Sequence, residues 1–356
     1  MEMKDGYFHR VTALTPTKFW VNNPTRHEAD LAIEAGATGC TLNPSYTQKM
    51  IDHPVEGAYA RVVLDEVIRE VSDDVEAVAE FQRRMAKPIC EKFKAIFEAS
   101  GHEEGYVSIQ GDPIREEDPN VIIHEAHANR TVSPNVCCKI PTTASGLKAM
   151  ETLLPEGIPM NATEIFAVQQ GLDLGEQYER LVPRGQKGPK LYYSHIAGIY
   201  DDYLKAYAAQ HKIDIPSDYL VQAGLAVSRK LYAIVKAANY RMSFIGGGAR
   251  GLHHFTELVG GDVNLTINWI GTADALLAQN PPVASRMFNP VEPQVLDALC
   301  AKLPAFQQGY EVGGIHVDEY EKFGPVELFR SSFIKSWERV LEIIAARRKE
   351  IAAQAA

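Results

Sequence analysis

Short apolar runs alternate with longer helical stretches along most of this chain. The apolar runs are five to seven residues long and lie at 18–22, 38–43, 105–110, 135–140, 158–163, 190–194, 241–245 and 262–268. Stretches with apolar residues at helical spacing lie between them, at 26–35, 46–100, 119–128, 146–154, 164–174, 200–210, 223–238 and 251–259. Runs that are apolar throughout are typical of parallel strands buried on both faces. Because 46–100 is too long for one crossover, it predicts several helices.

This repeated strand–helix order predicts a fold of class α/β, a (β/α)8 barrel. A doubly wound open sheet is the alternative, but it usually has fewer units and a glycine-rich first turn, which this chain lacks. We expect the barrel to occupy residues 1–280. A proline-rich stretch that begins at Pro281 then leads into a helical extension, 281–356, that packs on the barrel or its mouth.

Composition and charge exclude several classes of partner. Acidic residues number 46 and basic residues 36, for a net charge of −10, and no basic block is present. Nucleic-acid binders usually carry a basic face, so none is expected here. No apolar run approaches the ~20 residues of a membrane span, and residues 1–10 are too polar for a signal peptide, so we expect no membrane partner. The cysteines are odd in number, scattered and without CxxC spacing, which predicts reduced thiols and a cytoplasmic location: Cys40, Cys90, Cys137, Cys138 and Cys300.

In a barrel enzyme the active site lies at the carboxyl ends of the strands. The polar or unusual residues at these ends are Asn22, Asn43, Gln110, Lys139, Thr163, Ser194, Gly248, Arg250 and Asn268. We expect them to converge on one mouth, with Ser194 and Gly248 beside the substrate. The glycine-rich segment 246–250 follows the seventh strand, where a phosphate-binding loop is plausible, although a flexible tight turn fits as well.

Lys139 is the unusual member of this group, because it interrupts an apolar strand. Burial disfavours the ammonium form and lowers the pKa of a lysine. A neutral amine can attack a carbonyl substrate and form a Schiff base. The alternative is a lysine that extends out of the strand end or pairs with a carboxylate.

Histidines raise two further hypotheses. His195 at the end of the sixth strand could act as an acid–base group, or it could be a hydrogen-bonded histidine at the barrel rim. His124 and His127 share one helix face, and His253 precedes His254, but no third ligand is apparent at matching spacing. We therefore expect no metal.

The segment around Lys139 resembles the Schiff-base signature of the transaldolase family, which includes the fructose-6-phosphate aldolases. This segment, 136–151, reads VCCKIPTTASGLKAME and is the most specific part of the match. Weaker similarities in the same order cover 39–45, 107–110, 157–166, 198–205, 246–250 and 263–267.

This resemblance implies a class I aldolase on a (β/α)8 barrel that needs no cofactor. Lys139 would carry the covalent intermediate, and Asn43 and Asn161 would orient sugar hydroxyls. Thr163 would position a water that shuttles protons, and Arg250 would bind a phosphate or another anion. Members occur in several oligomeric states, which allows a homo-oligomer here.

Three positions depart from the family pattern. Asn22 stands where an acid–base aspartate is common, and Gln110 stands where transaldolases commonly have glutamate. Ile199 replaces an arginine that binds phosphate, which removes a bidentate contact. Because an amide cannot take up a proton at neutral pH, we expect His195, or failing that a water fixed by Thr163 and Gln110, to replace the missing acid.

The expected function is transaldolase-like: a three-carbon ketol unit leaves a sugar or sugar-phosphate substrate through a lysine Schiff base, in carbohydrate metabolism. One alternative is a fructose-6-phosphate aldolase-like lyase that acts on an unusual or unphosphorylated sugar. Another is a degenerate barrel that binds sugar without catalysis. A lyase for a keto acid is a further alternative, but it would need a positive carboxylate site that the sequence does not reveal. Neither the donor nor the acceptor sugar follows from the sequence.

Overall fold

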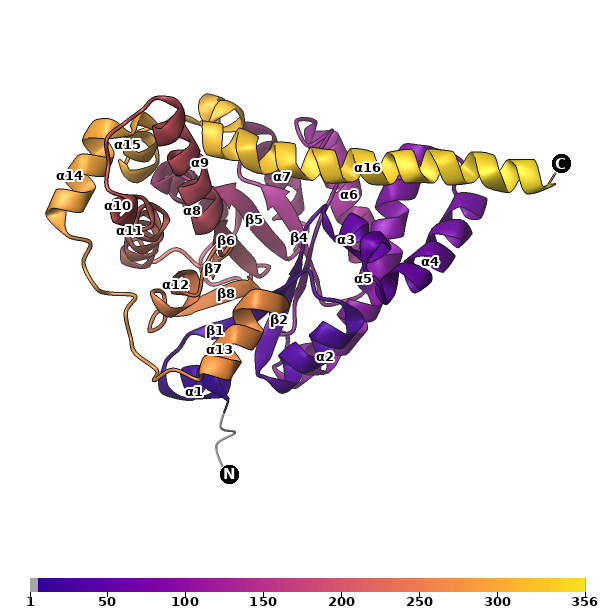
Figure 1. Ribbon diagram of the computed structural model, residues 1–356, viewed down its shortest axis with the longest axis horizontal. Helices are drawn as coiled ribbons and strands as arrows, with labels where there is room; N and C mark the ends of the chain where they lie inside the picture. The colour runs from indigo at the N-terminus through magenta and orange to yellow at the C-terminus, as the bar shows by residue number, and fades with distance from the viewer. Residues whose placement is uncertain (1–5, 356) are drawn as a thin grey trace.

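The computed structural model describes residues 6–355. Eight parallel strands close into a barrel in chain order, with helices outside it, which confirms the expected (β/α)8 fold (Figure 1). The strands are β1 Lys18–Asn22, β2 Ala37–Leu42, β3 Val107–Gln110, β4 Val136–Pro141, β5 Met160–Ile165, β6 Leu191–His195, β7 Ser243–Gly246 and β8 Val263–Asn268.

The helices follow the predicted pattern, with additional short helices at 217–220, 269–273 and 274–279 and with a few further differences. They are α1 Tyr7–Leu14, α2 Arg26–Glu34, α3 Tyr46–Asp52, α4 Glu56–Glu70, α5 Asp74–Ala99, α6 Pro119–Arg130, α7 Ala144–Leu153, α8 Val168–Leu181, α9 Ala197–Gln210, α10 Ser217–Leu220, α11 Ala223–Ala237, α12 His253–Thr256, η1 Trp269–Ala273, α13 Asp274–Gln279, α14 Pro293–Lys302, α15 Pro304–Tyr310, η2 Val317–Lys322 and α16 Gly324–Ala355. The long stretch 46–100 holds several helices, as expected. Helix α1 was not predicted, α12 is much shorter than 251–259, and the residues 164–167 precede α8 instead of opening it.

The alternation of side chains along each strand decides which residues enter the barrel. Trp20 of β1, Cys137 of β4 and Tyr192 of β6 share one buried cluster inside the barrel. Gly39 of β2 makes room for it, because a Cβ there would collide with the Trp20 indole. Two residues further along β4, Lys139 therefore also points inward.

The segment after the barrel ends in the long helix α16, which crosses one end of the molecule and packs against α3, α4, α5 and α9 (Figure 1). Arg347 forms an ion pair with Asp65 at 2.7 Å, and Arg348 forms one with Asp74 at 2.7 Å. These pairs hold the carboxyl-terminal half of α16 on α4 and α5. The amino-terminal half lies over the barrel mouth.

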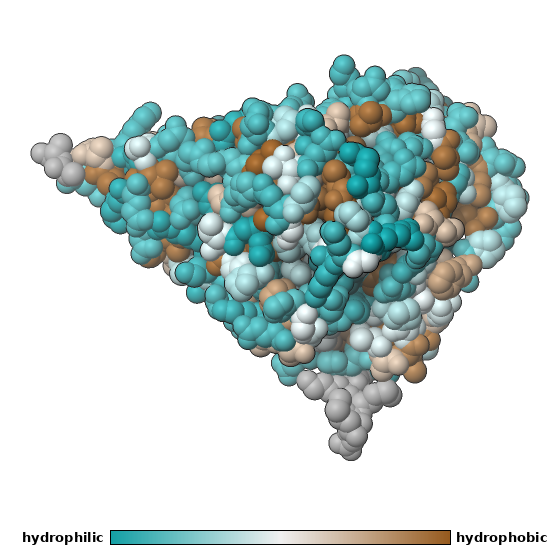
Figure 2. Space-filling view, turned by 180° about the vertical axis from the view of Figure 1, so that it is seen from behind, coloured by the Kyte–Doolittle hydropathy of each residue, from teal (hydrophilic) through white to brown (hydrophobic). Residues whose placement is uncertain are grey.

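The outer surface shows mainly hydrophilic residues with scattered hydrophobic ones on the face drawn in Figure 2. Within residues 6–355, no helix combines the length and the apolarity that crossing a membrane demands.

Candidate active site

A cavity of about 190 Å³ lies at the carboxyl ends of the strands. Its lining consists of Asn22, Thr41, Asn43, Lys139, Asn161, Ser194, Ile196, Ile199, Ile245, Gly247, Gly248, Ala249, Arg250, Thr266, Ile267 and Asn268 from the barrel, and Phe329, Ser332 and Phe333 from α16. Most of the residues expected at the site therefore share one cavity. The exceptions are Gln110, Thr163 and His195, which are not part of its lining.

Lys139 lies between the barrel and α16. Its side chain is 7% exposed, and its Nζ lies 5.5 Å from the ring centre of Phe329 and 5.6 Å from that of Phe333. Burial lowers the pKa of Lys139 to about 8, against the opposing effects of the carboxylates of Glu164 and Glu116. The Nζ of Lys139 forms no hydrogen bond or ion pair with another described residue. This is the environment of a reactive amine.

Asn161 is held rigidly beside Lys139, its register neighbour on β5. Its Nδ2 donates a hydrogen bond to Ser108 Oγ at 3.0 Å, and its Oδ1 accepts one from Ser194 Oγ at 2.6 Å. Both residues expected to contact substrate here, Asn161 and Ser194, thus orient each other across the cavity wall.

Asn22 is engaged in an uncharged network across the opposite wall. Its Nδ2 donates to Asn268 Oδ1 at 2.9 Å, and its Oδ1 accepts from Thr41 Oγ1 at 2.9 Å. Thr41 Oγ1 also lies 2.7 Å from Thr266 Oγ1. The network has no titratable member, so this wall offers no proton acceptor at neutral pH.

Asn43 lines the cavity with its amide oxygen already engaged. Its Oδ1 accepts hydrogen bonds from Asn23 Nδ2 at 2.8 Å, from Ser45 N at 3.1 Å and from Ser45 Oγ at 2.6 Å. With the oxygen saturated, the amide N–H groups are the part of Asn43 that can donate to a hydroxyl.

Gln110 and Thr163 lie below the cavity lining, next to an acid that the sequence analysis missed. Gln110 Nε2 donates to Glu164 Oε1 at 3.2 Å. Thr163 is fully buried, and its Oγ1 has no hydrogen-bond partner among the described residues. Glu164 was assigned to the start of a helix, although it lies inside β5. The end of β5 is irregular, and the periodicity of the sequence does not reveal this irregularity.

The structure corrects the interpretation of His195. Ser194 faces the cavity, so its neighbour His195 faces outward, where it is fully buried against α11. Its Nδ1 lies 2.8 Å from Ser228 Oγ, and its ring packs edge-on against Tyr200. Burial, with a smaller contribution from His254, lowers the pKa of His195 to about 3. It is therefore neutral at physiological pH and cannot reach the substrate as a base.

The far end of the cavity combines one cation with apolar walls. Arg250 Nε forms a 2.5 Å ion pair with Asp202, and Nη1 donates to the Gly248 carbonyl at 3.3 Å. Gly248 adopts a φ of +68°, and a Cβ there would collide with Ile196. Ile199 lines this end of the cavity. Arg250 is thus held at the cavity edge with its charge already partly compensated.

A cluster of histidine and aspartate side chains contacts the backbone of Arg250. The Arg250 backbone N–H donates to His254 Nδ1 at 3.3 Å, and His254 Nε2 lies 3.0 Å from Asp201 Oδ2. His253 brings its ring to the same cluster, and one ligand atom from each of the three side chains lies within 4.8 Å of the others. Sequence spacing missed this cluster, because Asp201 comes from α9. Both ring nitrogens of His254 already have partners, so hydrogen bonding accounts for its burial.

Comparison with known proteins gives one consistent result. The family model described as transaldolase/fructose-6-phosphate aldolase matches residues 19–311. Transaldolases from Saccharopolyspora erythraea and Frankia alni are both 32% identical, over 152 and 148 residues, or 42% and 41% of this chain. A Mycobacterium leprae transaldolase is 29% identical over 229 residues, 59% of this chain.

These matches cover 40%, 39% and 56% of the three relatives, so the alignments span about half or less of their length. A solved structure, the carboxyl transferase domain of Rhizobium etli pyruvate carboxylase with 3-bromopyruvate, covers 95% of this chain and 52% of that chain at a TM-score of 0.35 and 9% identity, a likeness too weak to carry an argument.

The family model covers nearly all of the barrel and extends into α15. It includes the strand that carries Lys139 and every other strand of the barrel except the first residue of β1. The chain belongs to the transaldolase/fructose-6-phosphate aldolase family.

Proposed function

We propose that this protein is a transaldolase-like class I aldolase in which Lys139 forms a Schiff base with a ketose. The observation that carries the proposal is the inward-facing, buried Lys139, whose pKa is lowered to about 8 at the mouth of the barrel. An amine with this pKa is neutral in a substantial fraction of molecules at neutral pH, whereas an ordinary lysine is not.

The surroundings of Lys139 support carbon–carbon cleavage as the next step. The protonated imine withdraws electrons from the bond between C3 and C4 of the ketose, the role that a metal ion fills in other aldolases. Asn43 and Asn161 offer amide groups at fixed positions on two sides of Lys139, suited to sugar hydroxyls. Phe329 and Phe333 limit the access of water to the imine.

The far end of the cavity supports a sugar or sugar-phosphate substrate with a modest preference for phosphate. Arg250 is the cation that lines the cavity there, and Asp202 already pairs with it. Ile196 and Ile199 form the neighbouring wall and add no donor. A hydrogen bond to a charged group contributes about 1.5–3 kcal/mol, or roughly one to two decades in affinity.

Borohydride trapping tests the proposal. The protein is incubated with dihydroxyacetone or fructose 6-phosphate, reduced and mapped by peptide mass spectrometry. We expect a stable adduct on Lys139 and none in Lys139→Met. Lys148→Met is the matched control, because Lys148 lies in the same segment but on the exposed face of α7, paired with Glu151 at 2.8 Å. An adduct on another lysine would disprove the assignment.

A second assay separates transfer from release. Consumption of the ketose is followed with and without an aldehyde acceptor. A rate that depends on the acceptor identifies a transaldolase, and a rate independent of it identifies an aldolase. Trapping on Lys139 without any cleaved product would identify a sugar-binding barrel instead. The free cysteines support a reducing compartment, such as the cytoplasm, as the site of this activity.

A further inference from the structure

The end of β5 departs from regular strand geometry at Glu164. The register between β5 and β6 shifts between Ala162 and Ile165, and Glu164 has a φ of +62°. No other non-glycine residue within the described strands has a positive φ. A residue with a Cβ is strained in this region, and such strain often accompanies a functional side chain. A strand irregularity of this kind redirects a side chain.

The redirected carboxyl group is buried, and only one of its two oxygens has a hydrogen-bond partner among the described residues. Glu164 is fully buried, and its Oε1 accepts the hydrogen bond from Gln110 Nε2. Its Oε2 has no partner among residues 6–355. The Glu164 carbonyl accepts a hydrogen bond from Gln170 Nε2 at 2.9 Å, which fixes the irregular backbone. An acid held in this way without a full set of partners costs stability, and a structural role alone does not account for it.

Charged groups from four parts of the chain face this carboxyl group. They are Lys139 of β4, Arg330 of α16, Glu321 of η2 and Glu116 of the loop before α6. Burial raises the pKa of Glu164 to about 7, while Lys139, Arg330 and the hydrogen bond from Gln110 act in the opposite direction. The pKa of Lys139 is lowered to about 8. The two pKa values lie close together, so the transfer of a proton from the amine to the carboxylate would cost little free energy near neutral pH.

We propose, building on the Schiff-base function above, that Glu164 is the proton acceptor and donor for Lys139 and replaces the acid that the barrel lacks at Asn22 and Gln110. Gln110 retains a role as the hydrogen-bond donor that orients the Glu164 carboxylate. The proposed acid therefore lies at the end of β5, whereas the family pattern has it at the end of β3. Both strands pair with β4, which carries Lys139.

Every proton in the proposed steps is accounted for. The Glu164 carboxylate takes a proton from the Lys139 ammonium, and the neutral amine attacks the ketose carbonyl. A proton moves from the positively charged nitrogen of this adduct to the alkoxide, which gives a neutral carbinolamine. The Glu164 carboxylic acid then protonates the departing hydroxyl, so water leaves and the iminium forms. Glu164 ends as the carboxylate beside the iminium cation, and hydrolysis runs the same steps in reverse.

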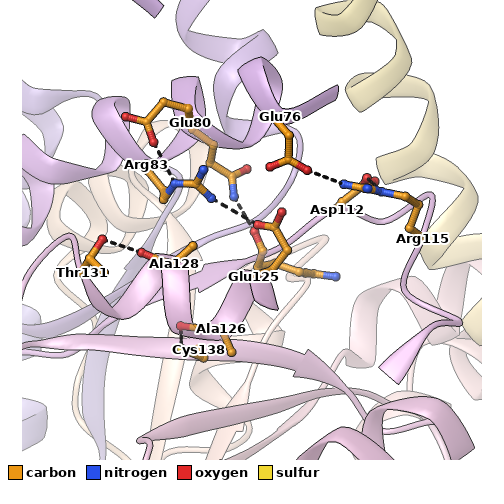
Figure 3. A network of polar contacts seen from close by, with 12 residues as sticks. Glu76, Glu80, Arg83, Asp112, Arg115, Glu125, Ala126, Ala128, Thr131 and Cys138 are labelled. Carbon is orange, nitrogen blue, oxygen red and sulfur yellow. Dashed lines mark hydrogen bonds and ion pairs between the residues drawn. The ribbon is translucent and has the colours of Figure 1, made fainter. Parts of the chain in front are cut away.

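Glu125 offers a matched buried acid without this role. It is 3% exposed, and burial raises its pKa as well. Its partner is Arg83 of α5 at 3.4 Å (Figure 3). Lys139 is not among the charges that act on Glu125. The variants Glu164→Gln and Glu125→Gln therefore remove comparable buried charges, and only the first removes a charge that faces Lys139.

The test measures the rate of dihydroxyacetone trapping on Lys139 with cyanoborohydride as a function of pH. General acid–base groups contribute about 10²–10⁴-fold, so we expect E164Q to trap at least about 100-fold more slowly at pH 7. E125Q should trap at the wild-type rate. Loss of the Glu164 carboxylate also lowers the pKa of Lys139, which by itself would make trapping faster at pH 7. A slower rate therefore cannot come from the charge state of Lys139.

The outcomes separate this inference from the proposed function. If wild-type protein forms no adduct on Lys139, the proposed function fails and this inference fails with it. If the wild type traps and E164Q traps as fast or faster, the inference alone is overturned. If E164Q does not fold, Glu164→Asp serves as the second variant, because it keeps the carboxylate but shortens the side chain by one methylene. It is expected to slow trapping by about tenfold or more, and an undiminished rate overturns the inference.

Discussion

The prediction that helix α16 shields Lys139 from water can be tested at Phe333. The ring is 5% exposed and, with Phe329, separates Lys139 from water at the cavity mouth. Phe333→Ala would let water reach the amine and relieve the desolvation that lowers its pKa. The ring also favours the ammonium form by a cation–π contact, whose loss would act in the opposite direction.

The two effects differ in size. Nζ lies 5.6 Å from the Phe333 ring centre, near the outer limit of about 6 Å for such contacts, so this contact contributes less than about 1 kcal/mol. A return of the pKa from about 8 to the ordinary 10.5 would be equivalent to about 3.4 kcal/mol. The neutral fraction at pH 7 would then fall from about 9% to about 0.03%, roughly 300-fold. We expect the pKa to rise by at least about one unit, since Phe329 remains.

The pH dependence of adduct formation on Lys139 measures this shift. The acidic limb of the profile reports deprotonation of Lys139 and should move to higher pH in Phe333→Ala. Leu328→Ala is the control, because Leu328 lies on the same helix and is 39% exposed. Circular dichroism checks the fold, since the loss of a buried phenylalanine costs about 3–5 kcal/mol. A folded variant whose limb stays at the wild-type pH would refute the shielding role of α16.

Other predictions concern the remaining parts of the site. His195→Gln should keep turnover within about threefold but lower stability by about 0.5–1.5 kcal/mol through its bond to Ser228, as thermal unfolding would reveal. Arg250→Met should reduce the preference for phosphorylated ketoses by about 10–100-fold in kcat/KM, and an unchanged preference would contradict the assignment. Gly39→Ala should destabilise the barrel by about 1–3 kcal/mol, measured by denaturant titration, because its Cβ would collide with Trp20. EDTA should leave activity intact, and inactivation reversed by zinc would be the contrary result.

The sequence predicted the strands within a few residues, because apolar runs bounded by polar residues follow directly from burial on both faces. The convergence of Asn22, Asn43 and Arg250 on one cavity followed from a general rule of barrels, and Asn161 followed from the resemblance to the family. The orientation of His195 was also within reach, since adjacent residues of a strand face opposite sides and Ser194 already faced the cavity.

The contributions of α16 and Glu164 could not be predicted from the sequence. The amphipathic pattern of α16 predicts a helix, but which of its residues enter the barrel mouth depends on how it packs against distant helices. Glu164 depends on an irregularity at the end of β5, and periodicity placed it in the following helix. Strand irregularities leave little trace in a single sequence, because their extra residue breaks the pattern by which strands are recognised.

The barrel geometry allows two positions for an acid that faces Lys139. Lys139 has close neighbours on both sides, Gln110 of β3 and Asn161 of β5, so a carboxylate at the end of either strand can face the amine. Under the proposed function the amine has no such freedom, because the imine would form beside Asn43 and Asn161, the residues proposed to hold the sugar. Glu164 is one step past Thr163 on β5, and only the positive φ turns its side chain toward Gln110 instead of away from the barrel. The positive φ at Glu164 and the hydrogen bond from Gln110 together fix the position of this carboxylate, and Glu164→Gln tests whether the carboxylate acts on the amine.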